Sequence, residues 1–376
     1  MSRYKDIDIA HIKKEQYSIL YNESIDNTEK FWSEISKRIH WFKDWDNISN
    51  VDYSKAKIKW FENGKLNVAY NCIDRHIESG HGDDIALIWE GNNPSDDKKY
   101  TYKELLIEVS KFSNVLKSNN VIKGDRVCIY MQMIPELAIA MLACARIGAI
   151  HSIVFGAFSP ESLRDRINDS KCKVVVTQDT GVRGLKQDIP MKENVDKAIS
   201  ECPSIDKVFV VKRTSANIQM KLSRDLWWHE EMLNISSSCK PEWMDSEDPL
   251  FILYTSGSTG TPKGVLHTTG GYLVYASYTH EVVFDYHHKD IYWCTADIGW
   301  ITGHSYIIYG PLSNRATTLM FEGVPNYPDF SRFWEIVDKI ASPTLGPIPL
   351  TLMILPNRLL SMSSRNPKSW WESSLM

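Results

Sequence analysis

Short β-branched segments alternate with longer amphipathic ones between residues 126 and 211 of this 376-residue chain. The predicted strands are residues 126–131 (RVCIYM), 151–155 (HSIVF), 173–177 (KVVVT) and 207–211 (KVFVV), and the predicted helices among them are residues 135–147 and 160–168. Apolar runs this short suit strands that are buried on both faces of a parallel sheet. Because strands and helices alternate along the chain, the pattern predicts an α/β fold.

Start signals fix where two of the helices begin. Thr101 and Glu104 have the spacing of a capping box, and the apolar residues that follow them repeat at helical spacing. Ser159 can cap a helix that starts at Pro160. Residues 31–42 (FWSEISKRIHWF) predict another short amphipathic helix, which packs outside the main domain and has no catalytic role.

Composition excludes several classes of protein. The 43 Lys and Arg residues are scattered among 47 Asp and Glu residues, without the basic stripe of a nucleic-acid-binding protein. Glu136, Arg146 and His151 interrupt the most apolar stretch, residues 133–158, so no membrane span is expected there. The N-terminus (MSRYKDIDIAHIKKEQYSIL) lacks the apolar core of a secretory signal, which indicates a cytoplasmic protein.

Neither the cysteines nor the histidines predict a metal site. The seven cysteines are far apart and form no CxxC pair, so reduced core thiols are expected. His287 and His288 are followed by Asp290, but adjacent histidines point in different directions. His229 and Glu230 begin like a metalloprotease motif, yet no second histidine follows at the required spacing. These groups are therefore expected to be solvated loop residues.

The most informative segment is residues 248–264 (DPLFILYTSGSTGTPKG). A short apolar strand, residues 251–254, runs directly into a loop rich in hydroxyl groups and glycines, with one lysine, Lys263. Glycines let backbone N–H groups approach an anion closely, hydroxyls add donors, and the lysine adds positive charge. The loop is not a Walker A motif, because Pro262 precedes the lysine and Gly264 follows it. We predict that it binds a polyphosphate; the alternative is a Ser/Gly-rich connector.

The run YTSGSTGTPKG resembles the phosphate-binding loop of the adenylate-forming superfamily. Other segments are similar to its acetyl-CoA synthetase family, namely residues 60–76, 155–167, 264–276, 292–312 and 317–329. The resemblance implies an α/β fold that corresponds to the N-terminal large-domain part of the adenylate-forming fold. It divides the chain into an N-terminal extension (1–95), a partial AMP-binding domain (96–339) and a divergent tail (340–376).

This resemblance also implies a reaction: ATP-dependent activation of acetate to acetyl-adenylate, followed by transfer to coenzyme A, with Mg²⁺ as a cofactor. The implied catalytic residues are Lys263 and Thr259, because charge builds on the departing pyrophosphate and is stabilised by a lysine, amides and Mg²⁺. The implied ligands of the ATP phosphates are Thr255, Ser256, Gly257, Ser258, Gly260, Thr261 and Gly264.

The family pattern further places the acetate pocket and the coenzyme A contacts. Ile301 and Thr302 line the implied acetate pocket. The implied coenzyme A contacts are Arg183, Gly184, Leu185, Lys186, Thr302 and Asn326. Leu185 and Lys186 replace a glycine and an arginine of the family pattern, which weakens bidentate phosphate binding at this point.

The family pattern stops at Lys339. The residues that follow contain no adenine-loop motif, no ribose-binding aspartate and no hinge. We therefore expect a truncated form with an unrelated tail, whose catalytic activity is open. Two alternatives stand beside acetate activation: a ligase for propionate or another short-chain acid, and a non-catalytic fragment.

Overall fold

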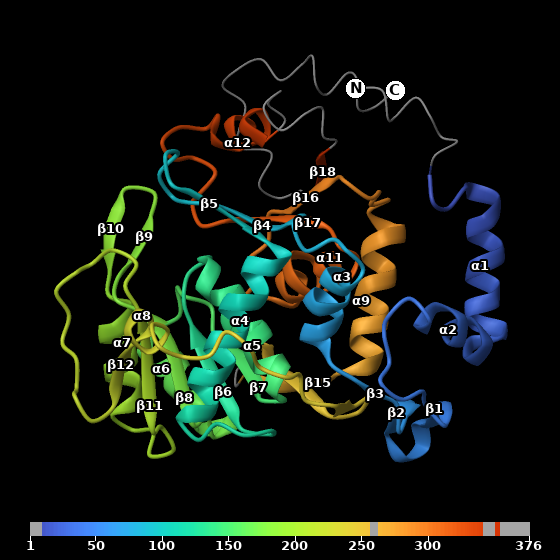
Figure 1. The fold of residues 1–376 in the computed structure, drawn as a ribbon, viewed down its shortest axis with the longest axis horizontal. Helices are drawn as coiled ribbons and strands as arrows, with labels where there is room; N and C mark the ends of the chain where they lie inside the picture. Colours follow the sequence, from blue (N-terminus) through green and yellow to red (C-terminus); the bar gives the residue numbers. More distant parts are fainter. Residues whose placement is uncertain (1–9, 256–261, 341–349, 354–376) are drawn as a thin grey trace.

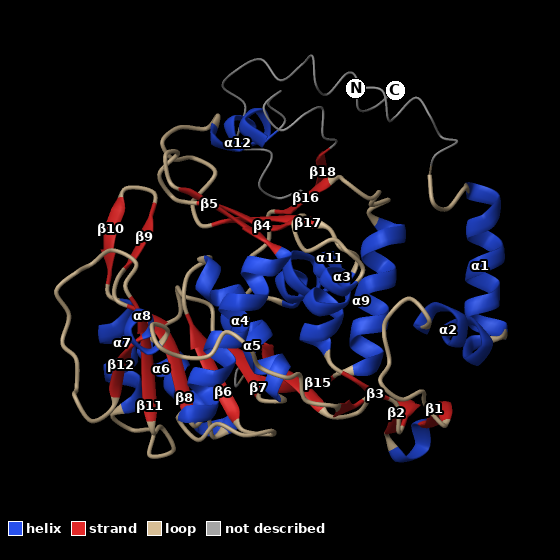
Figure 2. Cartoon of the chain, in the orientation of Figure 1, coloured by secondary structure: helices blue, strands red, loops and turns tan. Residues whose placement is uncertain are grey.

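The computed structural model describes residues 10–255, 262–340 and 350–353 of the chain. Among these residues, two large β-sheets alternate with layers of helices (Figure 1, Figure 2). The α/β architecture predicted from the alternation of strands and helices is confirmed.

The larger sheet has seven described strands. Their order is β12 (Asp225–Trp227), β11 (Lys207–Val211), β8 (Val174–Gln178), β6 (Arg126–Tyr130), β7 (Ile150–Ile153), β14 (Pro249–Thr255) and β15 (Lys263–Thr268). Neighbouring strands are parallel except β14 and β15, which form an antiparallel pair. The short β-branched runs are therefore parallel strands, as the sequence predicts.

Helices cover both faces of this sheet because side chains of its strands alternate between two cores. Val127 and Ile129 of β6 join the main hydrophobic core, whereas Cys128 and Tyr130 join a second one. The main core receives side chains from α4 (Tyr102–Ser118) and α5 (Pro135–Ile147), and the second from α6 (Pro160–Ser170) and α7 (Met191–Ile199). The short α8 (Trp228–Glu231) packs on α4 through Trp228 and Phe112, whose ring centroids are 3.7 Å apart.

The second sheet contains five described strands. Their order is β18 (Leu350–Met353), β16 (Ile291–Cys294), β17 (Thr317–Phe321), β4 (Ile85–Glu90) and β5 (Asp97–Thr101). Its outer face packs on α12 (Arg332–Ile340) through Trp293, Phe333 and Ile336. Its inner face joins the main core with α9 (Gly270–Val283) and α11 (Gly310–Ser313). Helices between the two sheets thus contribute to a single large core.

The first elements of the chain lie on one side of the two sheets (Figure 1); they are α1 (Lys14–Asp26), α2 (Thr28–Ser36) and the hairpin of β1 (Asn47–Asp52) and β2 (Lys57–Glu62). The short β3 (Lys65–Leu66) pairs with β13 (Met244–Asp245), and α3 (Arg75–Glu78) lies between the two sheets. The predicted helix over 31–42 is wrong beyond Ser36. The indole Nε1 of Trp41 donates to the Ser36 carbonyl at 3.1 Å, so the chain has already turned back on the helix end.

Helix starts agree closely with the sequence signals. Thr101 and Glu104 form the predicted capping box of α4, and Ser159 caps α6. The predicted strand over 151–155 ends early, at Ile153, because the chain turns at Phe155, whose carbonyl accepts from the Phe158 amide at 2.9 Å. Local signals therefore place elements well and strand ends less well.

Three further observations bear on the sequence predictions. All seven cysteines are buried free thiols, as expected. No helix in the described part of the chain is long and apolar enough to span a membrane. The predicted division between residues 95 and 96 falls between β4 and β5, which pair with each other in one sheet. The structure therefore does not separate two units at this point, and the predicted domain boundaries stay a prediction.

Candidate active site

The predicted site segments follow the carboxyl ends of strands. Thr255 ends β14, residues 301–302 follow β16, Asn326 follows β17, and the 183–186 segment follows β8. In open α/β sheets, ligands bind outside the carboxyl ends of the parallel strands. The topology therefore places these segments where a ligand is expected, although they belong to two different sheets.

The predicted phosphate loop joins β14 to β15. The strand register sets Thr255 opposite Lys263 and Tyr254 opposite Gly264. Thr255, Lys263 and Gly264 are exposed. Within the described residues, no carboxylate lies within ion-pair distance of the Lys263 ammonium. An ammonium in this position is available to an anion. The remaining predicted phosphate ligands, Ser256, Gly257, Ser258, Thr259, Gly260 and Thr261, lie outside the described residues.

Gly264 has a packing role at the base of this hairpin. A Cβ atom at Gly264 would lie 3.1 Å from Cγ2 of Ile252 and 3.3 Å from Cε1 of Tyr254. These contacts are tighter than most Cβ atoms make, so a side chain at this position would push Ile252 and Tyr254 aside by a few tenths of an ångström.

Helix α6 connects the hairpin to the segment after β16. The Tyr254 hydroxyl donates to Oδ2 of Asp169 at 2.5 Å, and the Arg166 guanidinium lies over the rings of Tyr254 and Phe158. Burial, followed by the bond to Asp169, raises the pKa of Tyr254, which keeps the hydroxyl protonated. Phe158 in turn contacts Trp300, with ring centroids 6.3 Å apart. The mouth of the phosphate loop and the 300–302 segment therefore lie on the same side of the molecule.

Ile301 and Thr302 lie in the short helix α10 (Ile301–Gly303), which directly follows a tight turn. The Gly299 amide donates to Oδ1 of Asp297 at 2.7 Å, and the Trp300 amide donates to the Asp297 carbonyl at 3.1 Å. Ile301 is 40% exposed and Thr302 is half-buried. Both are thus accessible at the surface beside Trp300, as a substrate contact requires.

Replacing Gly303 with alanine is expected to distort this turn. The new Cβ would lie 2.2 Å from the Asp297 carbonyl oxygen and 2.5 Å from Cα of Ile298, so backbone must move. Overpacking of this kind costs about 1–3 kcal/mol, which urea unfolding would measure. Gly271→Ala in α9 is the matched control, because its Cβ would meet only Trp60, at 3.4 Å. Equal stability of the two variants would contradict the prediction.

A buried cluster of histidine and aromatic rings supports the turn from behind, and the sequence analysis did not identify it. His304 Nδ1 donates to the Trp300 carbonyl at 3.1 Å, and its ring lies 4.6 Å from the Phe251 ring. His151 shares a hydrogen bond with the Tyr309 hydroxyl at 2.6 Å. Burial lowers the pKa of His304 to about 4 and lowers that of His151 as well. Both imidazoles are therefore neutral near pH 7 and act as packing groups.

The predicted coenzyme A segments come together from distant parts of the sequence. The strands β9 (Gly181–Arg183) and β10 (Lys186–Ile189) form a hairpin that turns at Gly184, where φ is +59°. That left-handed conformation favours glycine. A Cβ at Gly184 would lie 3.2 Å from Cγ2 of Val324, so the hairpin borders the loop that carries Asn326. Arg183 is half-buried, and Leu185, Lys186 and Asn326 are exposed.

Asn92 and an ion pair hold these two segments against each other. The Asn92 side chain accepts from the Gly184 amide at 2.6 Å and donates to the Gly184 carbonyl at 3.0 Å. The backbone N–H of Asn92 donates to Oε2 of Glu322 at 3.4 Å. The Arg213 guanidinium also donates twice to the Glu322 carboxylate, at 2.8 and 3.0 Å. Burial raises the pKa of Glu322, and Arg213 opposes that shift. No sequence motif pointed to Asn92 or Arg213.

The histidines considered for a metal site do separate. His288 faces Arg315, with nitrogens 2.8 Å apart, whereas His287 Nε2 lies 3.3 Å from Oδ1 of Asp285. The Asp290 carboxylate accepts from the backbone amide of His287 at 3.3 Å. His287, His288 and Asp290 thus do not converge, which agrees with the sequence argument about adjacent histidines.

Comparison with known proteins gives the family. Residues 74–370 match the family model of AMP-binding enzymes, and residues 17–72 match that of the acetyl-coenzyme A synthetase N-terminus. The first match continues past Lys339, where the recognisable motifs end. The chain is 62% identical over 331 residues to the acetyl-coenzyme A synthetase of Magnetococcus marinus, and 60% identical over 331 residues to acetyl-coenzyme A synthetase 2 of Pseudomonas aeruginosa.

Each alignment covers 88% of this chain and 51% of the relative, so the chain spans about half the length of the curated relatives it matches. The AMP-binding match covers most of the chain, and its range contains the β14–β15 hairpin and the segments that follow β8, β16 and β17. The family inferred from the phosphate loop is confirmed: the chain belongs to the AMP-binding enzyme family.

Proposed function

We propose that this chain carries the substrate-activating part of an AMP-forming acetate–CoA ligase. The observation that carries the proposal is the exposed Lys263 opposite Thr255 at the carboxyl end of β14, on the same side as Ile301 and Thr302. Both curated relatives described above bear the name acetyl-coenzyme A synthetase, which supports acetate as the acid. Its substrates would be acetate, ATP and coenzyme A, in the cytoplasm.

The reaction has two steps. An oxygen of acetate attacks the α-phosphorus of ATP, the bond from that phosphorus to the bridging oxygen breaks, and pyrophosphate leaves acetyl-adenylate behind. The coenzyme A thiol then loses its proton, its sulfur attacks the acetyl carbonyl, and AMP leaves. In both steps the departing group gains negative charge, which positive groups and hydrogen-bond donors stabilise.

Lys263 would stabilise the departing pyrophosphate. Its exposed ammonium and the Thr255 hydroxyl form a donor set that fits a polyanion. Thr259 would share the catalytic role, and the other predicted loop residues would donate to the phosphates. Mg²⁺, held mainly by phosphate oxygens and hydroxyls, would neutralise part of their charge. Ile301 and Thr302 would bound the acetate pocket.

Coenzyme A would contact the surface where the β9–β10 hairpin meets the 322–327 loop. Arg183, Lys186 and Asn326 present polar groups there, and Gly184 and Leu185 form the turn between them. Thr302 would approach coenzyme A from the segment after β16. We also propose that the chain divides at the ends of its recognisable motifs into residues 1–95, 96–339 and 340–376, whereas the AMP-binding match itself runs from residue 74 to residue 370.

Acetate-dependent exchange of labelled pyrophosphate into ATP tests the first step. Purified, folded chain is expected to catalyse the exchange, and Lys263→Ala is expected to reduce it by about 10²–10³-fold, the usual cost of losing one transition-state donor. Lys117→Ala is the matched control, because Lys117 is exposed at the end of α4 and far from the hairpin in sequence.

The outcomes separate the alternatives. Exchange that depends on Lys263 and favours acetate supports the proposal. Exchange that is faster with propionate than with acetate would mean that the substrate is a longer acid than acetate. A folded chain that shows neither exchange nor ATP binding would contradict the proposal and leave a non-catalytic fragment.

A further inference from the structure

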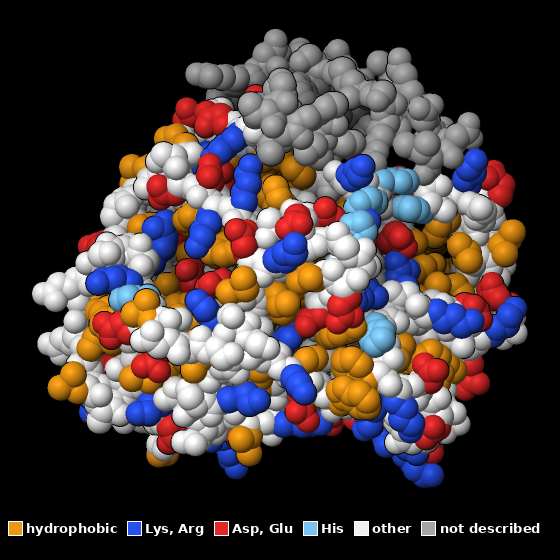
Figure 3. Space-filling view, viewed as in Figure 1, with side chains coloured by type: hydrophobic (Ala, Val, Ile, Leu, Met, Phe, Trp, Pro, Cys, Tyr) orange, Lys and Arg blue, Asp and Glu red, His pale blue; other side chains and the backbone are white. Residues whose placement is uncertain are grey.

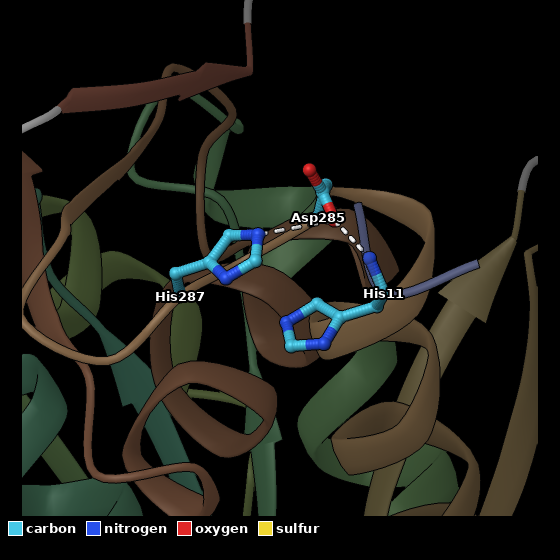
Figure 4. A group of neighbouring side chains, drawn as sticks. All are labelled: His11, Asp285 and His287. Atoms are coloured by element: carbon cyan, nitrogen blue, oxygen red, sulfur yellow. Dashed lines mark hydrogen bonds and ion pairs between the residues drawn. The ribbon is translucent and has the colours of Figure 1, made fainter. Parts of the chain in front are cut away.

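His11, Asp285 and His287 gather just beyond the C-terminal end of α9 (Figure 4). His11 lies shortly before α1, separated from it by Ile12 and Lys13, and the other two residues lie in the turn between α9 and β16. The His11 amide donates to Oδ1 of Asp285 at 2.9 Å, and Nε2 of His287 lies 3.3 Å from the same oxygen. One potential ligand atom from each residue lies within 4.8 Å of the others.

The hydrogen bonds around this cluster suit metal ligation. His11 Nε2 is 2.6 Å from the Tyr286 carbonyl oxygen, which can only accept, so Nε2 carries the proton and Nδ1 keeps its lone pair. A histidine that ligates a metal typically donates its other ring N–H to a carbonyl or carboxylate in this way. His287 Nε2 is shielded from water and makes no well-aligned hydrogen bond among the described residues, although Oδ1 of Asp285 lies 3.3 Å away. An ion held between this nitrogen and that oxygen would be coordinated by both.

Two imidazoles and one carboxylate are a typical set of ligands for Zn²⁺. The two histidine rings now stack, with centroids 4.2 Å apart and an angle of 11° between planes, so one ring must turn before both can direct lone pairs at one ion. His11 and Asp285 are exposed, and exposed side chains change rotamer within nanoseconds. The required movement is therefore small and fast.

Other candidate ligands nearby are occupied or enclosed. His288 faces Arg315, and all seven cysteines are buried. Histidine side chains gather on the surface near this end of α9 (Figure 3). The ligand set within the described residues is thus confined to His11, Asp285 and His287.

A metal ion here would attach the N-terminal segment to the main domain. Helix α1 has no buried residue, and a groove of about 540 Å³ lies between α1, α2 and α9. His11 and Asp285 are 274 residues apart in sequence, so a shared ion would join two distant parts of the chain. An ion that binds only when both parts are in place shifts the equilibrium towards the attached state.

We propose that His11, Asp285 and His287 form a zinc-binding site that attaches the segment before α1 to the turn after α9. The site is independent of the proposed acetate activation. It also departs from the sequence expectation that the chain has no metal site, because His11 lies too far from His287 in sequence for any local motif to pair them.

Isothermal titration of the tag-free, chelator-treated chain with ZnCl₂ tests the proposal. We expect one zinc ion per chain, and at least about tenfold weaker binding in His11→Ala and in Asp285→Asn, each of which removes one ligand. His288→Ala is the matched control, because it removes the neighbouring imidazole that faces Arg315. Both test positions are exposed, so the variants are expected to fold, which circular dichroism would check.

Limited trypsin digestion gives a second readout. Zinc is expected to slow cleavage after Lys13 and Lys14, which lie beside the site, in the wild-type chain and in His288→Ala but not in His11→Ala. Absence of zinc binding to the wild-type chain would overturn the proposal. So would equal loss of binding in His288→Ala and His11→Ala, or binding that leaves cleavage after Lys13 and Lys14 unchanged.

Discussion

Lowering the pH from 7 to 5 is expected to remove at least about 6 kcal/mol from the free energy of unfolding, because buried histidines, His151 among them, resist protonation in the folded state. Burial lowers the pKa of His76 and of His280 to about 3, and that of His304 to about 4. In the unfolded chain these groups bind protons near pH 6.5. The stability that these neutral histidines contribute is complete above about pH 6.5 and is lost progressively as the pH falls towards their folded-state pKa values of about 4 and 3.

The surroundings of each ring explain why protonation is resisted. Burial and then the charge of Arg75, in the same helix, lower the pKa of His76, and the hydrogen bond from its Nε2 to the Leu312 carbonyl, at 2.8 Å, partly opposes that shift. His280 Nδ1 accepts from Asn314 at 3.0 Å, and the positive charge of Arg38 opposes a second charge there. Burial raises the pKa of Glu322, so on acidification this carboxyl takes up its proton more readily in the folded than in the unfolded chain, which offsets part of the loss.

Urea unfolding between pH 5 and 7.5 would measure this effect. Below pH 6 the slope of the free energy of unfolding is expected to reach at least about 4 kcal/mol per pH unit, the value for the three protons that His76, His280 and His304 take up on unfolding. His280→Gln keeps an acceptor for Asn314 and is expected to reduce the slope by about one proton, or about 1.4 kcal/mol per unit. His229→Gln, at an exposed position in α8, is the control. Constant stability from pH 7 to 5 would contradict the prediction.

The elements that the sequence predicted well are those with local signals. Pro135 and Gly148 bracket α5, whose observed bounds are the predicted ones, and the capping box at Thr101 starts α4. Strand ends were less accurate because they depend on where the neighbouring strand stops. The helix predicted over 31–42 ended early because Trp41 packs back on it, a contact that the apolar periodicity does not encode.

The candidate site shows the same division between local and long-range information. The order of residues in the 248–264 segment predicted the strand that leads to the loop, and the structure confirms that strand as β14. The contacts that hold the coenzyme A segments together join Asn92 to Gly184 and Arg213 to Glu322, which are 92 and 109 residues apart. Pairings at such separations depend on the complete fold, so residue patterns alone could not give them.

Arg146 illustrates the same limit within the core. In the sequence it was only an interruption of an apolar stretch. In the structure its guanidinium donates twice to the Asp74 carboxylate, at 2.8 Å each, and its Nε donates to the Cys239 carbonyl at 2.6 Å. The Arg146 side chain is 4% exposed and that of Asp74 12%. Arg146 therefore ties α5 to two distant segments through a desolvated ion pair.

Replacing Arg146 with methionine is expected to cost about 3–5 kcal/mol of folding free energy, the usual effect of breaking a buried ion pair by removing one partner. Methionine fills much of the space but leaves the Asp74 carboxylate and the Cys239 carbonyl without their donors. Lys103→Met is the matched control, because Lys103 pairs with Asp83 at the surface, with side chains 53% and 84% exposed. Its expected cost is about 0–1 kcal/mol.

A double-mutant cycle separates the loss of the pair from the burial of an unpaired charge. Asp74→Asn removes the charge that Arg146→Met leaves behind, so the double variant is expected to lose less stability than the sum of the two single losses, by about 1–3 kcal/mol. Urea unfolding at pH 7 would measure all four chains. Strictly additive losses would mean that Arg146 acts through its packing and its bond to Cys239, and that the Asp74 carboxylate does not depend on it.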